Sequence, residues 1–417
     1  MAVNGGYRVA MNPWPLIVSA LRRHHGTALA FVLLVAAGVT LAVAITSQER
    51  ALRSGSARAA ERFDIVVAPP GSRTDALLSA VFLRPGSSRL LSAQITAALL
   101  ADTRAVFASP LAFGDSHRGA PVIGAIAALT ARLSPTLAEG RHFAARGEAV
   151  VGAASTLRLG DTFAPAHGIH HAGKHHSGEA DNDLHEASIR VVGRMSPTGS
   201  PWDRAIVVPI ETVWALHELP DGQPEGATRI GPPFDAGRVP GIPAAVLHPR
   251  SVADAYRLRA AYTGTESMAF FPAEVLVQLY ATLGDIRQLM SLIAIATQLL
   301  VLAAIVASVL LILKLLAPRF VTLRMLGAPR RYVFAVAWGY TATLVTLGVG
   351  LGLVGGYALS FGLARWLEAS SGVALRPSLG AAEWAMAAIM LALGWLLALL
   401  PAWRVQRLDL ALAMKGV

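Results

Sequence analysis

The sequence predicts an α+β membrane protein with four transmembrane helices, one N-terminal and three C-terminal, and a large mixed α/β domain on the outer side of the membrane. Three observations predict it. Mean hydropathy is +0.51, with 54% hydrophobic and 15% charged residues, which is too apolar for a soluble chain of 417 residues. Four apolar stretches are each long enough to cross a hydrocarbon core, which needs about 20 helical residues. The formal charge of +10 lies around those stretches, because residues 46–288 hold 23 basic and 23 acidic side chains.

Residues 1–26 are expected in the cytoplasm, and 27–46 form the first predicted span. Within the N-terminal segment, residues 13–23 predict a short helix in the membrane interface, because four apolar side chains share one helical face ahead of two arginines. A cleaved signal peptide is the alternative, since Ala42-Val43-Ala44 has the small-residue pattern of a cleavage site. The apolar run is longer than a signal core of about 7–15 residues, which favours an uncleaved anchor.

Residues 47–288 are predicted to form the outer domain, in which short β-branched runs alternate with helical segments. A Pro/Gly-rich stretch from Pro220 to Pro243 is expected to be a long loop, and Phe271 to Gln288 is expected to be a helix leading into the second span. The chain has no cysteine, which excludes disulfides and thiolate metal sites. Strands are expected at 63–67, 149–151, 189–192 and 205–208, and helices at 91–101, 211–218 and 251–261.

The last three spans are predicted at 289–316, 333–361 and 382–400, joined by a basic loop at 317–332 and followed by a tail at 401–417. With Lys314 counted in the basic loop, the three segments placed inside hold 11 basic residues against the single acid Asp409. The cationic side of a membrane protein is cytoplasmic, so both termini are expected inside. A pI near 10.6 does not indicate nucleic-acid binding, because the basic residues are divided among juxtamembrane segments.

Two sequence motifs lie in the last third of the chain. The basic loop contains the run LRMLGA at 323–328, and the tail contains Pro401, Arg404, Arg407, Leu408 and Asp409 in order. With the order of one span, a large outer domain and three spans, these motifs resemble the FtsX-like permease family, the membrane subunits of ABC systems that include MacB-type and lipoprotein-releasing transporters. Residues 191–213 resemble a strand-turn-strand of a MacB-like periplasmic domain. The chain departs from the family pattern in having Arg319 where a glutamate is usual and Leu410 where a proline is usual.

The resemblance implies a multi-pass permease in a bacterial inner membrane that acts as a dimer with a second permease subunit. Its further partners would be membrane lipid, a cytoplasmic ABC ATPase and a periplasmic binding or adaptor protein. No G-x-x-x-x-G-K-[ST] loop occurs, so ATPase activity is expected on a separate subunit and no nucleotide cofactor in this chain. Without the resemblance, the arginines of the basic loop could serve topology alone, and Gly327 could end a helix. The residues implied in ATPase docking are Arg324, Leu326, Gly327, Arg330 and Arg331.

The third predicted span contains Gly348, Gly352 and Gly356 at four-residue spacing. Small residues on one helical face allow two backbones to approach closely, so these glycines are candidates for a packing seam. The seam could lie within one subunit or between two. Gln298 is the one amide in the spans, which argues against a polar conduction path and favours a subunit that transmits movement to its outer domain.

The segment 167–186 holds six of the twelve histidines together with four acidic residues. Imidazoles bind zinc and other divalent transition metals, and carboxylates can complete the shell. The alternative is a solvated insertion without specific binding. No H-E-x-x-H motif occurs, and the consecutive Asp115-Ser116-His117 cannot form a triad because neighbouring side chains point apart. The candidate metal ligands are His167, His170, His171, His175, His176 and His185.

Three functions are consistent with these features. The first is a permease subunit that transmits ATPase movement to a periplasmic domain, with a zinc-related substrate suggested by the histidines. The second is an FtsX-like regulator that switches a periplasmic cell-wall hydrolase without transport. The third is a membrane-anchored metal-binding or sensor protein without an ATPase.

Overall fold

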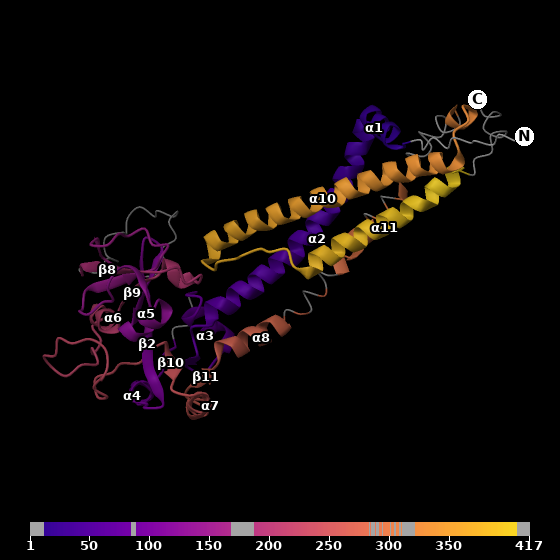
Figure 1. The fold of residues 1–417 in the computed structure, drawn as a ribbon. Coiled ribbons are helices and arrows are strands. Elements are labelled where there is room, and N and C mark those ends of the chain that lie inside the picture. Colours follow the sequence, from indigo (N-terminus) through magenta and orange to yellow (C-terminus); the bar gives the residue numbers. More distant parts are fainter. Residues whose placement is uncertain are drawn as a thin grey trace, which may run out of the picture. The chain divides into compact units, whose positions relative to one another are not determined.

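The computed structural model describes residues 12–84, 89–167, 187–282 and 322–406, and scattered positions between 284 and 310 (Figure 1). The chain forms two compact units, each with its own core. Unit 1 comprises Met1–Ala51, Asp285–Arg365 and Arg376–Val417, and unit 2 comprises Leu52–Gly284 and Trp366–Leu375.

Unit 1 is helical. Its elements are α1 (Trp14–Arg23), most of α2 (His25–Ala60), most of α10 (Arg330–Ser371) and α11 (Ala381–Gln406). Among the described residues, three helices are long and apolar enough to cross a membrane, namely α2, α10 and residues 381–399 of α11. They contain the spans predicted at 27–46, 333–361 and 382–400, whereas most of the span predicted at 289–316 lies outside the described residues.

The helices α2 and α10 are longer than the predicted spans, with 36 and 42 residues. Each continues past the boundary of unit 1, so that residues 52–60 of α2 and 366–371 of α10 belong to unit 2. No helix or strand was predicted for residues 362–381. Residues 47–60 contain neither proline nor a run of β-branched side chains, so their composition permits the added turns of α2 without requiring them.

Unit 2 is built on a mixed sheet with strand order β11-β1-β10-β2-β3-β9-β5-β8-β4, to which β6 and β7 add at β8 and β2. The pairs β3–β9 and β5–β8 are parallel, and the other pairs are antiparallel. The long strand β2 joins the two halves, because residues 105–111 pair with β10 and residues 112–117 pair with β3. The strands are β1 (Ile65–Ala68), β2 (Ala105–His117), β3 (Ala120–Ala125), β4 (Leu137–Gly140), β5 (Glu148–Val151), β6 (Thr162–Phe163), β7 (Ala166–His167), β8 (Ile189–Met195), β9 (Ile206–Pro209), β10 (Ala244–Pro249) and β11 (Met268–Phe270).

Both faces of the central strands are buried. In β1, Ile65 and Val67 belong to one hydrophobic cluster, while Val66 and Ala68 belong to another. Side chains alternate across a strand, so an unbroken apolar run requires a core on each side of the sheet. Short continuous runs of apolar residues therefore predicted strands. The mixed α/β organisation of the domain is confirmed.

Helices cover this sheet and begin at recognisable caps. The hydroxyls of Ser72, Ser92 and Ser251 accept hydrogen bonds from backbone N–H groups three residues later, at 3.1, 3.3 and 3.1 Å. The Pro220–Pro243 stretch contains no helix or strand apart from a bridge between Leu91 and Ile242. The helical elements of unit 2 are α3 (Arg73–Ala80), α4 (Ala93–Leu100), α5 (Ala127–Leu133), η1 (Pro201–Arg204), α6 (Ile210–Leu216), α7 (Val252–Ala261) and α8 (Pro272–Thr282).

The ends of α2 and α10 are tied to the sheet within unit 2. Arg204 of η1 donates to the carbonyl of Glu368 at 2.7 Å, and the N–H of Ala374 donates to the carbonyl of Gly199 at 3.1 Å. The hydroxyls of Ser56 and Tyr280 form a hydrogen bond between α2 and α8. Residues 366–375 are therefore part of unit 2, although they follow the third predicted span in sequence.

Candidate functional site

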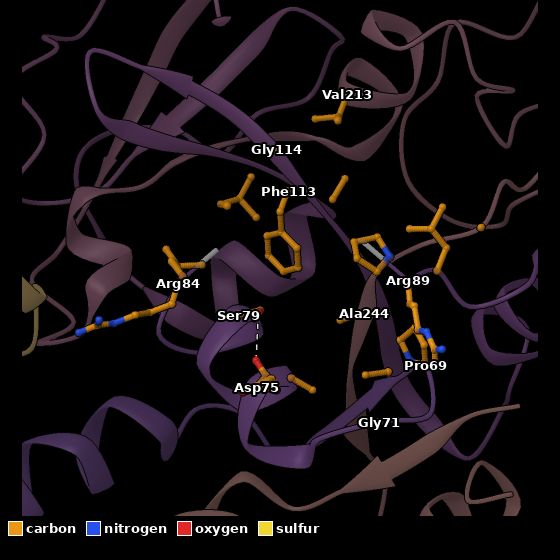
Figure 2. A pocket seen from close by; sticks show the side chains of 18 of the residues that line it. Pro69, Gly71, Asp75, Ser79, Arg84, Arg89, Phe113, Gly114, Val213 and Ala244 are labelled. Atoms are coloured by element: carbon orange, nitrogen blue, oxygen red, sulfur yellow. Dashed lines mark hydrogen bonds between the residues drawn. The ribbon is translucent and has the colours of Figure 1, made fainter. Parts of the chain in front are cut away.

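Unit 2 contains a cavity of about 720 Å³. Its walls come from the end of β1, from α3, from the middle of β2 and from α6, and they are mostly apolar. Figure 2 shows Phe113 near the centre of this lining, with Arg84 and Arg89 on either side of it. Polar groups reach the cavity at Asp75, Arg84, Arg89, Asp115 and His217. Apolar walls with a few polar groups are typical of a small-molecule site.

Asp115, His167 and His217 meet beside this cavity. The Nε2 of His217 lies 3.0 Å from one carboxylate oxygen of Asp115, and the Nδ1 of His167 lies 3.4 Å from the other. The two imidazole rings have centroids 5.0 Å apart. The three ligand atoms all lie within 4.8 Å of one another, which is a spacing that can hold a metal ion.

Three separate elements position these side chains. Asp115 and His167 are direct partners in the antiparallel pairing of β2 with β7. The register of β2 shifts between Ala112 and Asp115, where Gly114 has φ +134°, a conformation that favours glycine. His217 follows the last residue of α6, whose end it caps by donating its backbone N–H to Val213 at 3.2 Å.

The loop after α6 is fixed by a buried carboxylate on the same helix. Glu211 is 1% exposed, and its Oε1 accepts hydrogen bonds from the N–H of Gly231 at 2.6 Å and the amide of Gln223 at 3.1 Å. Burial raises the pKa of the Glu211 carboxyl, and these hydrogen bonds act in the opposite direction. The network holds α6, and with it His217, against the loop of residues 220–243.

The three members differ in exposure. The side chain of Asp115 is 1% exposed, that of His217 is 29% exposed and that of His167 is 53% exposed. The buried carboxylate is thus the fixed member of the group, and a metal ion could enter from the side of the imidazoles. His117, at the end of the same strand, is not part of the group, because its Nδ1 lies 3.0 Å from the carbonyl of Ala164 and its ring packs on Phe163.

One of the six histidines predicted as metal ligands therefore lies in this cluster. The other five, His170, His171, His175, His176 and His185, lie outside the described residues. Sequence reasoning missed Asp115 and His217 as partners of His167, because about 50 residues separate each from the next. It considered Asp115 only with its neighbours in sequence, and no local pattern marks the strand pairing that brings the three together.

The residues predicted to dock an ATPase form a turn in unit 1. Residues 322–325 are helical, the N–H of Ala328 donates to the carbonyl of Leu323 at 3.0 Å, and α10 begins at Arg330. Gly327 has φ +90°, a left-handed conformation that favours glycine. Leu326 is 81% exposed, Met325 is 63% exposed, and Arg330 and Arg331 are exposed while Arg324 is half-buried.

The predicted packing glycines lie against α2 within the same chain. A Cβ atom built on Gly348, Gly352 or Gly356 would lie 2.7, 2.5 or 2.6 Å from the Cβ of a valine of α2. The valines are Val35, Val39 and Val43, which repeat with the same four-residue spacing. Of the two arrangements left open by the sequence, the structure has this seam within the subunit, and Figure 1 shows α2 and α10 side by side there.

Comparison with known proteins gives little guidance. No family model matches the chain, and no curated protein matches it. A solved structure described as the extracellular domain of the noncanonic ABC-type transporter YknZ from Gram-positive bacteria is similar over 49% of this chain and 98% of its own, with 10% sequence identity and a TM-score of 0.27. A likeness of this size carries no argument about fold or function.

Proposed function

We propose that this chain is the permease subunit of a bacterial ABC system and transmits movement of a cytoplasmic ATPase to its outer domain. One observation carries the proposal. The helices α2 and α10 each run without a break from the membrane-capable unit into the outer unit, across residues 51–52 and 365–366. A continuous helix is a stiff element, because every turn is held to the next by backbone hydrogen bonds. Displacement at one end is therefore expected to reach the other.

The turn at 322–331 supports the part of the proposal in which this chain binds a cytoplasmic ATPase. Two large apolar side chains, Met325 and Leu326, project at its tip beside the exposed Arg330 and Arg331. Apolar side chains exposed together and flanked by cations are typical of a surface that docks a protein partner. Among the described residues, no atom lies within 4 Å of a Cβ built on Gly327, which agrees with an exposed turn.

The composition of the spans favours transmission over conduction. In residues 27–46, 333–361 and 382–400, Glu383 is the one acidic or basic side chain, and it is paired with Arg50. Polar pathways through membranes are marked by ionisable residues that face a cavity. The three membrane-capable helices of the described chain have no such pathway.

Charge reversal at the turn should uncouple the ATPase. In the double variant Arg330→Glu/Arg331→Glu, and separately in Leu326→Ser, we expect the amount of ATPase that co-purifies in mild detergent to fall about 30-fold, which corresponds to a loss of roughly 2 kcal/mol at an interface hot spot. Arg365→Glu, at the other end of α10, is the matched control and should leave co-purification unchanged. Co-purification at the native level in both turn variants would leave these residues with a role in topology alone.

Reporter fusions test the orientation on which the proposal depends. A reporter that is active only outside the cytoplasm should be active when fused near Gly222 and silent when fused near Pro329 or at Val417, because 11 basic residues mark the inner segments. Activity at Pro329 would place the turn on the outer side and remove any role in ATPase docking.

A further inference from the structure

We propose that Asp115, His167 and His217 form an exchangeable binding site for a divalent transition metal at the edge of the apolar cavity. The site goes beyond the proposed function, because it lies entirely in unit 2 and its occupancy does not depend on whether an ATPase docks.

The spacing of the ligand atoms fits a small ion. A tetrahedral zinc ion with bonds of about 2.0–2.1 Å to nitrogen and oxygen keeps neighbouring ligand atoms about 3.3 Å apart. The Nε2 of His217 lies 3.0 Å from Oδ2 of Asp115, and the Nδ1 of His167 lies 3.4 Å from Oδ1, so each imidazole is close to a different carboxylate oxygen. One ligand atom from each residue lies within 4.8 Å of the other two, so a modest inward movement would bring the three to the spacing of a tetrahedral site.

The chemistry of the ligand set agrees with the spacing. Two imidazoles and one carboxylate bind first-row divalent ions such as zinc, and they do not suit calcium or magnesium, which prefer oxygen ligands. Asp115 is 1% exposed and uses both of its oxygens toward the two histidines. A divalent cation bound here would compensate the negative charge of this buried carboxylate.

The three ligands that the described residues supply favour exchange of the metal. Structural zinc sites are closed by four protein ligands, whereas three protein ligands leave a fourth position for water or another molecule. Asp115 and His217 line the cavity, so the fourth position faces a space of about 720 Å³. A metal held in this way can be received and released through the cavity, which suits the handling of a metal by an outer domain.

Binding of Zn²⁺ to the full chain in detergent tests the site. We expect the native chain to bind one equivalent at the cluster, measured by equilibrium dialysis, and Asp115→Asn or His217→Gln to weaken that binding by about 100-fold or more, since loss of even an outer-shell partner costs roughly 10–100-fold. His117→Gln is the matched control on the same strand and should bind as the native chain does. Thermal melting of each variant separates loss of the site from loss of the fold.

Two further variants decide between this cluster and the neighbouring histidines. A variant with His170, His171, His175, His176 and His185 all changed to glutamine should retain the Zn²⁺ bound at the cluster. In His217→Cys, Co²⁺ should produce a thiolate-to-cobalt absorption band, which can arise only from the introduced side chain because the native chain has no cysteine. Loss of all binding in the five-histidine variant, or no thiolate band in a folded His217→Cys, would overturn the proposal.

Discussion

Replacing Gly352 with alanine is expected to destabilise the packing of α2 on α10 by about 1–3 kcal/mol, the usual cost of overpacking a tight interface. The added Cβ would lie 2.5 Å from the Cβ of Val39 and 2.9 Å from the carbonyl oxygen of Ala36. The hydroxyl of Thr40 also donates to the carbonyl of Gly352 at 3.2 Å, so the two backbones cannot separate without losing that bond. Gly352→Leu should prevent recovery of monodisperse protein.

The control for this prediction is Gly350→Ala on the same helix. A Cβ at Gly350 would meet no atom of the described residues within 4 Å, and alanine favours helix over glycine. Its thermal stability in detergent should equal or slightly exceed that of the native chain. Equal melting temperatures for Gly350→Ala and Gly352→Ala would show that the close approach at Gly352 contributes nothing to stability.

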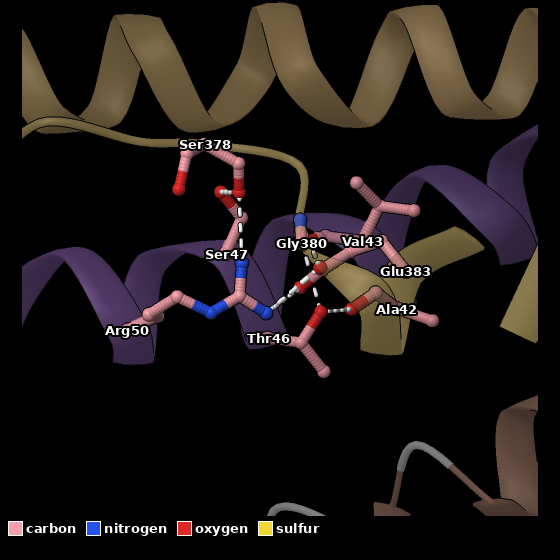
Figure 3. Close-up of polar contacts among 8 residues, drawn as sticks. All are labelled: Ala42, Val43, Thr46, Ser47, Arg50, Ser378, Gly380 and Glu383. Atoms are coloured by element: carbon pink, nitrogen blue, oxygen red, sulfur yellow. Dashed lines mark hydrogen bonds and ion pairs between the residues drawn. The ribbon is translucent and has the colours of Figure 1, made fainter. Parts of the chain in front are cut away.

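Removal of Arg50 should destabilise unit 1 by about 3 kcal/mol, because it leaves a buried carboxylate without its partner. The side chain of Glu383 is fully buried, and one nitrogen of Arg50 lies 2.7 Å from both of its oxygens. Figure 3 shows the guanidinium of Arg50 between the carbonyl of Ser378 and Glu383, and it donates to that carbonyl at 2.9 Å. The pair fastens α2 to the start of α11, so we expect a lower melting temperature in detergent for Arg50→Ala.

A double-mutant cycle separates the ion pair from a general effect of truncation. Arg50→Ala/Glu383→Gln should be less destabilised than the sum of the two single variants, since the second change removes the unpaired charge. Arg50→Lys should lie between the native chain and Arg50→Ala, because an ammonium keeps the charge without the planar guanidinium. Additive single effects would mean that Arg50 and Glu383 do not stabilise one another.

Much of the fold was predictable because its signals are local. An apolar run long enough to span a bilayer, as in residues 333–361, predicts a membrane-spanning helix whatever side chains it contacts. The continuous apolar strand around Ile206 likewise reported burial on both faces of a sheet. The caps at Ser72, Ser92 and Ser251 are set by residues within one helical turn. Helix length was less predictable, because the ends of α2 and α10 are held by contacts to residues distant in sequence.

The candidate sites likewise include features that local sequence predicts and features that depend on contacts between distant residues. Gly348, Gly352 and Gly356 were identified by their spacing, since small residues repeated on one face indicate close packing wherever it occurs. The spacing alone does not identify the helix against which these glycines pack. That helix is α2, which lies more than 300 residues earlier in the chain. Arg324 and Gly327 belong to a local sequence motif, and the structure places them in one turn that precedes Arg330, while their role in docking stays a prediction.

The sequence by itself determined the membrane-capable helices, the mixed α/β character of the outer domain and the histidine-rich segment that begins at His167. The tertiary structure decided which groups meet His167, because a cross-strand pair in β2 and β7 brings Asp115 to it and the end of α6 brings His217. The physical reason is the range of the interactions. Hydrophobicity, charge and capping act on neighbouring residues, whereas strand register and helix ends bring side chains about 50 positions apart within 4.8 Å of one another.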